Sequence, residues 1–244
     1  MTESSAFERS LTTNPTTATK EPAKPQSLNR RDLKIADPVT PPPAPIAPVG
    51  GRIKRAFDFL AALAAIIFLS PVLVLIAITV RYSSGPDIIF KQERGGLAGK
   101  PFVIFKFRTM TVQENGDTVV QAKRDDDRVT GVGKLLRSTS LDELPQLFNV
   151  LRGDMSLIGP RPHALHHDNE FAKRHSKYRR RHATRPGITG LAQVTGFRGE
   201  IETDDDLDNR IAADIQYVDQ WSMRLDLSIL VRTILVVPFD KNAY

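Results

Sequence analysis

The chain has 244 residues, of which 41% are hydrophobic and 25% are charged, as in ordinary globular proteins. It contains no cysteine, which excludes a disulfide framework, thiolate catalysis and cysteine metal ligands. The net charge of +6 and the isoelectric point of about 9.6 suit anionic partners, such as nucleic acid, an anionic membrane surface or polyphosphate substrates.

Residues 1–50 are rich in Ser, Thr, Pro and Ala and end in the run TPPPAPIAPVG. Proline-rich segments of this kind form extended linkers and do not build a core, so we predict a disordered tail over residues 1–50. Residues 5–25 contain no apolar stretch of the kind found in secretory signals, and no such signal is expected there.

A long apolar run follows at residues 56–80. A helix of this length reaches roughly 37 Å, against a bilayer core of about 30 Å. Because the run is apolar on all sides, a helix in the core of a soluble protein is disfavoured. Pro71 removes the hydrogen bond to residue 67, and the hydroxyl of Ser70 can partly satisfy the freed carbonyl groups.

Two membrane topologies fit this run. Cations flank it on both sides: Arg52, Lys54 and Arg55 before it, Arg81, Lys91 and Arg94 after it. Since Lys and Arg favour the cytoplasmic side, cations on both flanks suit a re-entrant helix broken at Ser70-Pro71, whose two ends stay on one face. Proline is also common in spanning helices, so a transmembrane helix fits as well.

Aromatic and β-branched residues predict two strands, at residues 88–90 and 102–107. The loop RGGLAGK between them either is a plain hairpin connection or lets phosphate groups approach its backbone closely. It lacks the spacing of a Walker loop. In the second strand, Lys106 and Arg108 alternate with phenylalanines, so the two cations project from one face.

The chain is organised around the stretch STSLDELPQLFNVLRGDMSLIGPRP at residues 138–162. Leu144, Leu147, Phe148 and Leu151 recur with the spacing of one apolar helix stripe. Gly153 stands where a helix C-terminus favours a residue with positive φ. We therefore predict a short helix that ends at Gly153.

The start of this helix has two interpretations. Ser140 and Glu143 match a capping box, whereas Pro145 is best tolerated in a first turn and moves the start to about Asp142. In both cases Asp142 and Glu143 lie at the helix N-terminus, where the helix dipole favours ionised carboxylates. Such a pair can bind Mg²⁺ or attack phosphorus, and ordinary helix capping is the competing interpretation.

After this helix, residues 155–158 predict a short strand, and the rigid GPRP corner holds Arg161 in a fixed direction, suited to phosphate oxygens.

The five histidines have no zinc-site spacing. The basic run at residues 173–185 binds nucleic acid, anionic lipid headgroups or no partner at all. At a membrane surface we expect it to form a basic amphipathic helix with Phe171 and Tyr178 at the boundary. Residues 204–217 predict a helix with an acidic start. An apolar helix follows Trp221, which packs in a core or at a lipid boundary.

Five of these segments together resemble the monotopic bacterial phosphoglycosyl transferases, also called bacterial sugar transferases. The matching pieces, in chain order over about residues 51–235, are KRAFDF…LSP, KPF…KFRTM, the central stretch, RPGITGLAQVTG and YVDQWSMRLDLSIL. The last piece is most similar to the members that initiate exopolysaccharide synthesis with a hexose-1-phosphate. The loop after residue 190 departs from the pattern of many relatives, so no sugar contact is carried over to it.

The resemblance implies an α+β, mostly helical fold. A re-entrant helix-break-helix hairpin would enter the membrane over residues 51–83. A cytosolic catalytic domain over residues 84–244 would contain a small β element and interfacial amphipathic helices. The implied location is the cytoplasmic face of the bacterial inner membrane, with the lipid bilayer as a partner, no nucleic acid, and homo-oligomers left open.

The resemblance also implies a reaction. Asp142 and Glu143 match the catalytic pair and would hold the cofactor Mg²⁺. Asp142 would attack the β-phosphate of a UDP-hexose, such as UDP-glucose or UDP-galactose, to release UMP and form a phosphosugar-aspartate. Undecaprenyl phosphate would then take the phosphosugar. Four arginines are expected to bind substrate phosphates: Arg108, Arg137, Arg161 and Arg185.

A rival hypothesis from another class is a membrane-anchored adaptor that binds nucleic acid or lipid through residues 173–185. It predicts strongly salt-dependent binding and gives the acidic pair no role. Beyond Tyr178, that run lacks the aromatic residues on which bases stack.

Overall fold

The computed structural model describes residues 48–111, 126–197, 199, 201 and 203–236. The tail predicted over residues 1–50 lies almost wholly outside the described residues. The described part is mostly helical with two small two-stranded sheets, which confirms the coarse fold class predicted from the sequence.

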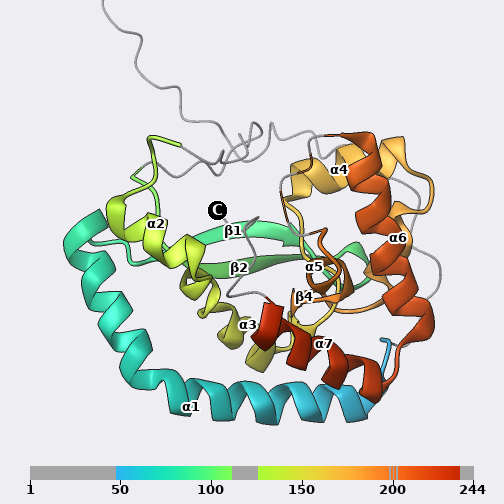
Figure 1. The fold of residues 1–244 in the computed structure, drawn as a ribbon, viewed down its shortest axis with the longest axis horizontal. Helices are drawn as coiled ribbons and strands as arrows, with labels where there is room; N and C mark the ends of the chain where they lie inside the picture. Colours follow the sequence, from blue (N-terminus) through green and yellow to red (C-terminus); the bar gives the residue numbers. More distant parts are fainter. Residues whose placement is uncertain (1–47, 112–125, 198, 200, 202, 237–244) are drawn as a thin grey trace, which may run out of the picture. The chain divides into compact units, whose positions relative to one another are not determined.

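The apolar run forms α1, a helix of 34 residues over Gly51–Ser84. Among the described residues it is the one helix long and apolar enough to cross a membrane. It is continuous through Pro71 rather than broken, and the Ser70 hydroxyl donates a 2.9 Å hydrogen bond to the carbonyl of Ile67, as expected from the sequence. Figure 1 shows that α1 bends: its first limb passes beneath α3 and α7, and its second limb rises beside α2. Proline inside a helix is the usual cause of such a bend.

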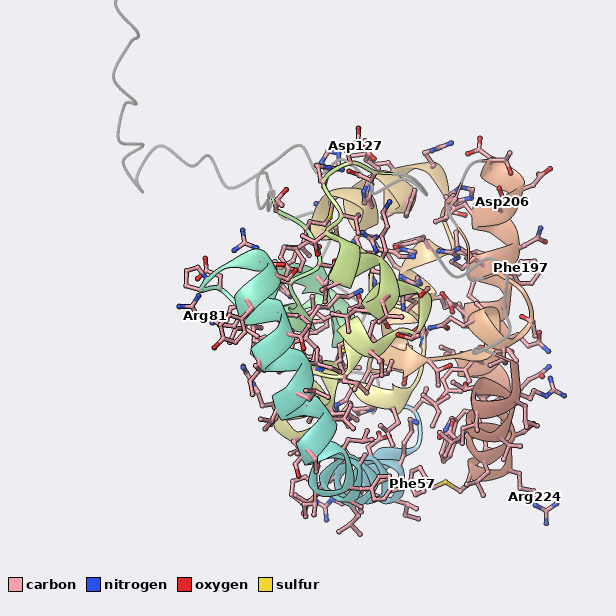
Figure 2. All side chains as sticks on the ribbon, turned by 60° about the vertical axis from the view of Figure 1, so that its left-hand side comes forward. Phe57, Arg81, Asp127, Phe197, Asp206 and Arg224 are labelled. Carbon is pink, nitrogen blue, oxygen red and sulfur yellow. The ribbon has the colours of Figure 1, made fainter. Side chains whose placement is uncertain are left out.

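The two limbs of α1 pack on different parts of the fold. Ala62 on the first limb lies in a core cluster with Leu147 and Val150 of α3 (Gln146–Arg152). Val80 on the second limb lies in another cluster with Phe107. Phe57 and Arg81, at opposite ends of the bent helix, mark the two limbs in Figure 2. Both limbs are thus attached to the rest of the domain.

Large apolar side chains nevertheless remain exposed along α1 and on α7 (Met223–Val236). Those on α1 are Ile53, Phe59, Leu60, Leu63, Ile67, Phe68, Val72, Val74, Leu75, Ile78 and Tyr82, and those on α7 are Leu227, Val231, Ile234 and Leu235. An apolar surface of this extent marks a membrane or protein interface.

The predicted strand pair is an antiparallel hairpin of β1 (Ile89–Gly95) and β2 (Pro101–Phe107). The loop between them contains the 3₁₀ turn η1 (Leu97–Gly99). β1 is longer than predicted because all seven of its residues pair with β2, although its second half is polar. A Cβ on Gly95 would lie 1.8 Å from Oδ2 of Asp168, so this glycine permits close packing of β1 against α4.

A second sheet pairs β3 (Ser156–Ile158) in parallel with β4 (Gly187–Thr189). The first hairpin lies between α3, which contacts β2, and α4 (Leu165–Arg174), which contacts β1 (Figure 1). The remaining helical segments are α2 (Gly131–Ser138), η2 (Leu141–Glu143), η3 (Tyr178–Ala183), α5 (Leu191–Val194) and α6 (Asp204–Gln220).

The predicted amphipathic helix over the basic run is wrong. The run is divided between the end of α4 and η3, and Tyr178 is fully buried rather than at a membrane boundary. Tyr178 can be buried because its hydroxyl donates a hydrogen bond to the buried carboxylate of Asp168. Several arginines of the run are paired with acidic residues of α6: Arg174 with Asp204, Arg180 with Asp219 and Arg181 with Asp214. Nδ1 of His175 lies 2.7 Å from Oδ1 of Asp208.

Trp221 lies in the core rather than at a free surface. It is half-buried, packs against the cluster of Ile158, Tyr217 and Ile229, and donates from Nε1 to Asp226 at 3.0 Å. The indole therefore has both the apolar neighbours and the polar partner that a buried tryptophan requires.

Candidate active site

The acidic pair lies in the short turn η2, just before α3. The predicted capping box is wrong: Ser140 has φ of +57° and makes no side-chain cap bond, so the chain turns there instead of starting one long helix. Pro145 then precedes α3 as its N-cap, and Gly153 ends it with φ of +90°, as predicted. Three residues of the predicted stripe, Leu147, Phe148 and Leu151, lie on α3, but Phe148 is 43% exposed.

Both carboxylates of the pair are buried, Asp142 at 7% and Glu143 at 9% exposure, but their neighbours are cations. Glu143 accepts from Lys106 Nζ at 2.8 Å and from both Arg161 Nη atoms, at 2.6 and 3.1 Å. Burial alone would raise the pKa of Glu143, yet Arg161 and Lys106 together hold it well below its usual value. Glu143 is therefore a permanent anion.

Asp142 has a different electrostatic environment. Burial, reinforced by the charge of Glu143, raises the pKa of Asp142 to about 6 against the opposing effect of Lys106, Arg137 and Arg161. Two neighbouring carboxylates with pKa values displaced in opposite directions are a common basis for separate chemical roles. Asp142 is the more basic of the two, and hence the better candidate for a nucleophile.

Lys106 is a site residue that the sequence prediction did not include. It lies on β2 between Phe105 and Phe107, and β2 contacts η2. Strand alternation indicated that the ammonium group projects from one face, but no sequence signal showed that Glu143, 37 residues later, lies opposite it.

The four predicted arginines are not all brought together. Arg161 is paired with Glu143, and Arg137, in the last turn of α2, lies near enough to Asp142 to lower its pKa. Arg108 is bonded to the loop after β2, where Nε donates to the carbonyl of Met110 at 3.1 Å and Nη2 to that of Thr111 at 2.8 Å.

Arg185 lies at the opposite end of α3 from the acidic pair. Its Nε donates to the carbonyl of Gly153 at 2.9 Å, beside Arg55, which donates to the carbonyls of Val150 and Leu151. Arginines commonly satisfy the last carbonyls of a helix in this way. The observed contacts of Arg185 are therefore those of a structural residue.

The donor atoms of the acidic pair limit how the site could hold a metal. Across the described ranges, no three His, Asp or Glu side chains form a metal-binding group. Mg²⁺, however, is commonly held by one or two protein carboxylates, with its other ligands from substrate phosphates and water. Because the oxygens of Glu143 already accept bonds from two cations, the pair fits Mg²⁺ best with Asp142 as the main ligand.

Comparison with known proteins places these features in context. The sequence pattern of the bacterial sugar transferase family matches residues 49–240. A UDP-glucose:undecaprenyl-phosphate glucose-1-phosphate transferase of Caulobacter vibrioides is 51% identical over 191 residues, which are 78% of this chain and 72% of that protein. A protein of the same name from Klebsiella pneumoniae is 47% identical over 82% of this chain but only 43% of its own length.

Exopolysaccharide production protein ExoY of Sinorhizobium fredii is 40% identical over 216 residues, which are 82% of this chain and 91% of that protein. The chain is thus comparable in extent to the shorter relatives and spans less than half of the longer ones.

Proposed function

The chain belongs to the bacterial sugar transferase family, and on this premise we propose that it transfers a hexose-1-phosphate from a UDP-sugar to undecaprenyl phosphate, as the first step of an exopolysaccharide or other surface glycan. The names of the Caulobacter and Klebsiella relatives favour UDP-glucose as the donor, with UDP-galactose as the alternative. The observation that carries the proposal is the unequal pair, with Asp142 more basic and Glu143 held as an anion.

In the first half-reaction, a carboxylate oxygen of Asp142 attacks the β-phosphorus of the UDP-sugar. The new bond joins this oxygen to the β-phosphorus, and the bond from that phosphorus to the bridging oxygen breaks, so UMP leaves with the bridging oxygen. In the second, an oxygen of undecaprenyl phosphate attacks the same phosphorus and the aspartate is regenerated. Covalent catalysis of this kind divides one difficult transfer into two easier ones.

The cations around the pair suit this chemistry. Phosphoryl transfer is assisted by fixed positive charge near the equatorial oxygens of the phosphorus. Glu143 holds Arg161 and Lys106 beside Asp142, so the two cations are in place before the diphosphate arrives. Mg²⁺ bound at Asp142 and Glu143 would neutralise charge on the diphosphate.

The lipid acceptor gives α1 and α7 a role. A polyprenyl chain stays in the bilayer, so its phosphate lies at headgroup height and the site must lie there too. The exposed apolar residues of α1 and α7 would enter the bilayer, on the cytoplasmic face of the inner membrane. Both limbs of α1 pack on the same domain. This favours the re-entrant arrangement, because a straight spanning helix would carry one of its ends to the other side of the membrane, away from that domain.

The decisive test withholds the lipid acceptor. Purified protein mixed with Mg²⁺ and UDP-glucose should release one equivalent of UMP and gain the mass of a hexose phosphate on the peptide that contains Asp142. Asp142→Asn should fold, partition with membranes and do neither. Asp205→Asn, an exposed acid on α6, is the matched control and should behave as wild type. Turnover by Asp142→Asn, or UMP release only when the lipid phosphate is present, would exclude the covalent aspartate.

Topology is tested separately. Because the chain has no native cysteine, Pro48→Cys and Pro86→Cys place single thiols just outside the two ends of α1. In sealed membrane vesicles, both should react with an impermeant maleimide from the same side. Reaction from opposite sides would show a spanning helix.

A further inference from the structure

Two arginines from distant parts of the chain, the buried Arg181 and the half-buried Arg94, hold the backbone of the GPRP corner. The carbonyl of Arg161 accepts a 2.5 Å hydrogen bond from Nη2 of Arg181, and the carbonyl of Pro162 accepts one of 3.1 Å from Nη1 of Arg94. Pro160 and Pro162, on either side of Arg161, have no backbone N–H to donate. Side chains from β1 and η3 therefore help to set the direction in which Arg161 leaves the chain.

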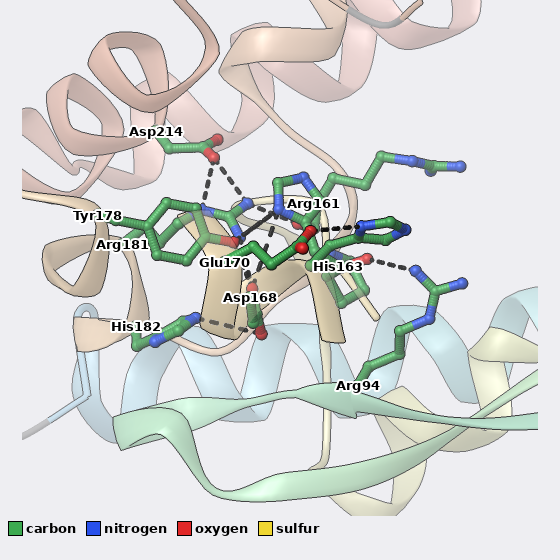
Figure 3. A network of polar contacts seen from close by, with 11 residues as sticks. Arg94, Arg161, His163, Asp168, Glu170, Tyr178, Arg181, His182 and Asp214 are labelled. Atoms are coloured by element: carbon green, nitrogen blue, oxygen red, sulfur yellow. Dashed lines mark hydrogen bonds and ion pairs between the residues drawn. The ribbon is translucent and has the colours of Figure 1, made fainter. Parts of the chain in front are cut away.

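Arg181 is itself held on several sides. Its Nε and Nη2 donate to Oδ2 of Asp214 at 2.9 and 2.8 Å, and its Nη1 donates to the hydroxyl of Tyr178 at 3.1 Å. Tyr178 in turn donates to Asp168 and lies 2.7 Å from Nδ1 of His163. Figure 3 shows the guanidinium of Arg181 between Asp214 and the Tyr178–Asp168 pair. We call these five residues the Arg181 network.

The Arg181 network carries a desolvation penalty, because it places charged groups in the interior. Arg181 is 2% exposed, and both of its carboxylate neighbours are buried. Burial alone would lower the pKa of Arg181, but Tyr178, Asp214 and Asp168 raise it above its ordinary value, so the charge is permanent. Replacing buried ion pairs with apolar residues of similar volume is often neutral or stabilising. A gain in stability therefore does not explain the Arg181 network. A role in holding neighbouring residues in position explains it.

That neighbour is the charge cluster of the active site. Arg161 leaves the GPRP corner and forms a two-bond contact with Glu143, which also holds Lys106. This contact depends on the geometry of the guanidinium fork, so a small rotation of the Arg161 backbone would break it. We propose that Arg181, fixed by Asp214, is a positioning residue that holds the Arg161 backbone so that Arg161 meets Glu143 beside Asp142. This inference rests on the proposed function.

A double-mutant cycle tests whether Arg181 acts through Arg161. In detergent-solubilised full-length protein, Arg181→Met should lower kcat/KM for UMP release by about 100-fold, since a displacement of 1 Å can have that effect. In an Arg161→Ala background, the same substitution should change kcat/KM by less than about threefold, because the group it positions is gone. A role in folding alone would lower the activity by the same factor in both backgrounds.

Two further variants guard against loss of folding. Arg181→Lys keeps a cation beside Asp214, but an ammonium group lacks the fork that reaches both Asp214 and the Arg161 carbonyl. It should stay folded, with a smaller fall in melting temperature than Arg181→Met, and still lose most of kcat/KM. Arg180→Met is the matched control: Arg180 is exposed, pairs with Asp219 and should be dispensable.

The possible failures are distinguishable. If the wild-type protein releases no UMP, the proposed function is wrong and the inference falls with it. The inference alone is wrong if the wild type is active but Arg181→Met lowers kcat/KM by the same factor with and without Arg161→Ala. It is also wrong if Arg181→Lys retains full activity.

Discussion

Lys54 provides a strong test of how α1 is attached to the rest of the domain. It lies in the first two turns of α1, is 3% exposed, and donates from Nζ to Oδ2 of Asp226 on α7 at 2.7 Å. Asp226 is fully buried and also accepts from Tyr217 and Trp221, while Asp58, also buried, lies 4.0 Å from the same ammonium group. One cation therefore serves two buried carboxylates.

Lys54→Met keeps most of the side-chain volume and removes the charge. Breaking a buried ion pair by removing one partner costs about 3–5 kcal/mol, because a charge is left without compensation. For a domain of this size, 1 kcal/mol corresponds to about 2–4 °C in melting temperature. We therefore expect the melting temperature to fall by roughly 6–20 °C.

The chain has a single tryptophan, and it contacts Asp226, so the fluorescence of Trp221 in detergent reports unfolding at this site. Lys54→Met/Asp226→Asn should recover at least half of the loss, because Asn is neutral: its oxygen can still accept from Trp221, and its NH2 group can donate to the hydroxyl of Tyr217, which keeps its own bond to the carbonyl of Ile158. Arg52→Met, at an exposed neighbouring position, is the control. An unchanged melting temperature in Lys54→Met, or a double variant less stable than the single one, would refute this reasoning.

Three other predictions concern the site and its supports. Because the nucleophile must be ionised and the pKa of Asp142 is raised to about 6, kcat/KM for UMP release should fall about tenfold per pH unit below pH 6 and level off above it; a flat profile between pH 4.5 and 7 would contradict this. Arg185→Ala should lower the melting temperature, since the carbonyl of Gly153 loses its donor, but leave the KM for UDP-glucose unchanged. A large rise in KM would instead support the phosphate-binding role predicted for Arg185 from the sequence. Gly95→Ala should reduce stability strongly because its Cβ would overlap the carboxylate of Asp168, and thermal unfolding will show whether it does.

Several features of this protein were determined by the sequence itself. The apolar residues of α1 indicated a helix of membrane-spanning length, and the hydroxyl of Ser70 bonds the carbonyl freed by Pro71, as the local chemistry predicted. Gly153 ends α3 with the expected positive φ. These predictions hold because each depends on residues within one or two helical turns of one another. The five matching segments likewise indicate the family without any tertiary information.

The chemistry of the acidic pair was decided only by the tertiary structure. Asp142 and Glu143 are adjacent, and no local pattern separates their ionisation. Glu143 accepts hydrogen bonds from Lys106 of β2 and Arg161 of the GPRP corner, whereas at Asp142 burial outweighs the effect of the neighbouring cations and raises the pKa. The charged run around Arg181 suggested a surface, yet Asp214, 33 residues later, draws Arg181 into the interior. Periodicity reports local conformation and which face of an element is apolar. Which charge stands opposite which is determined by the packing of elements far apart in the chain, and the pKa values of buried groups follow from that packing.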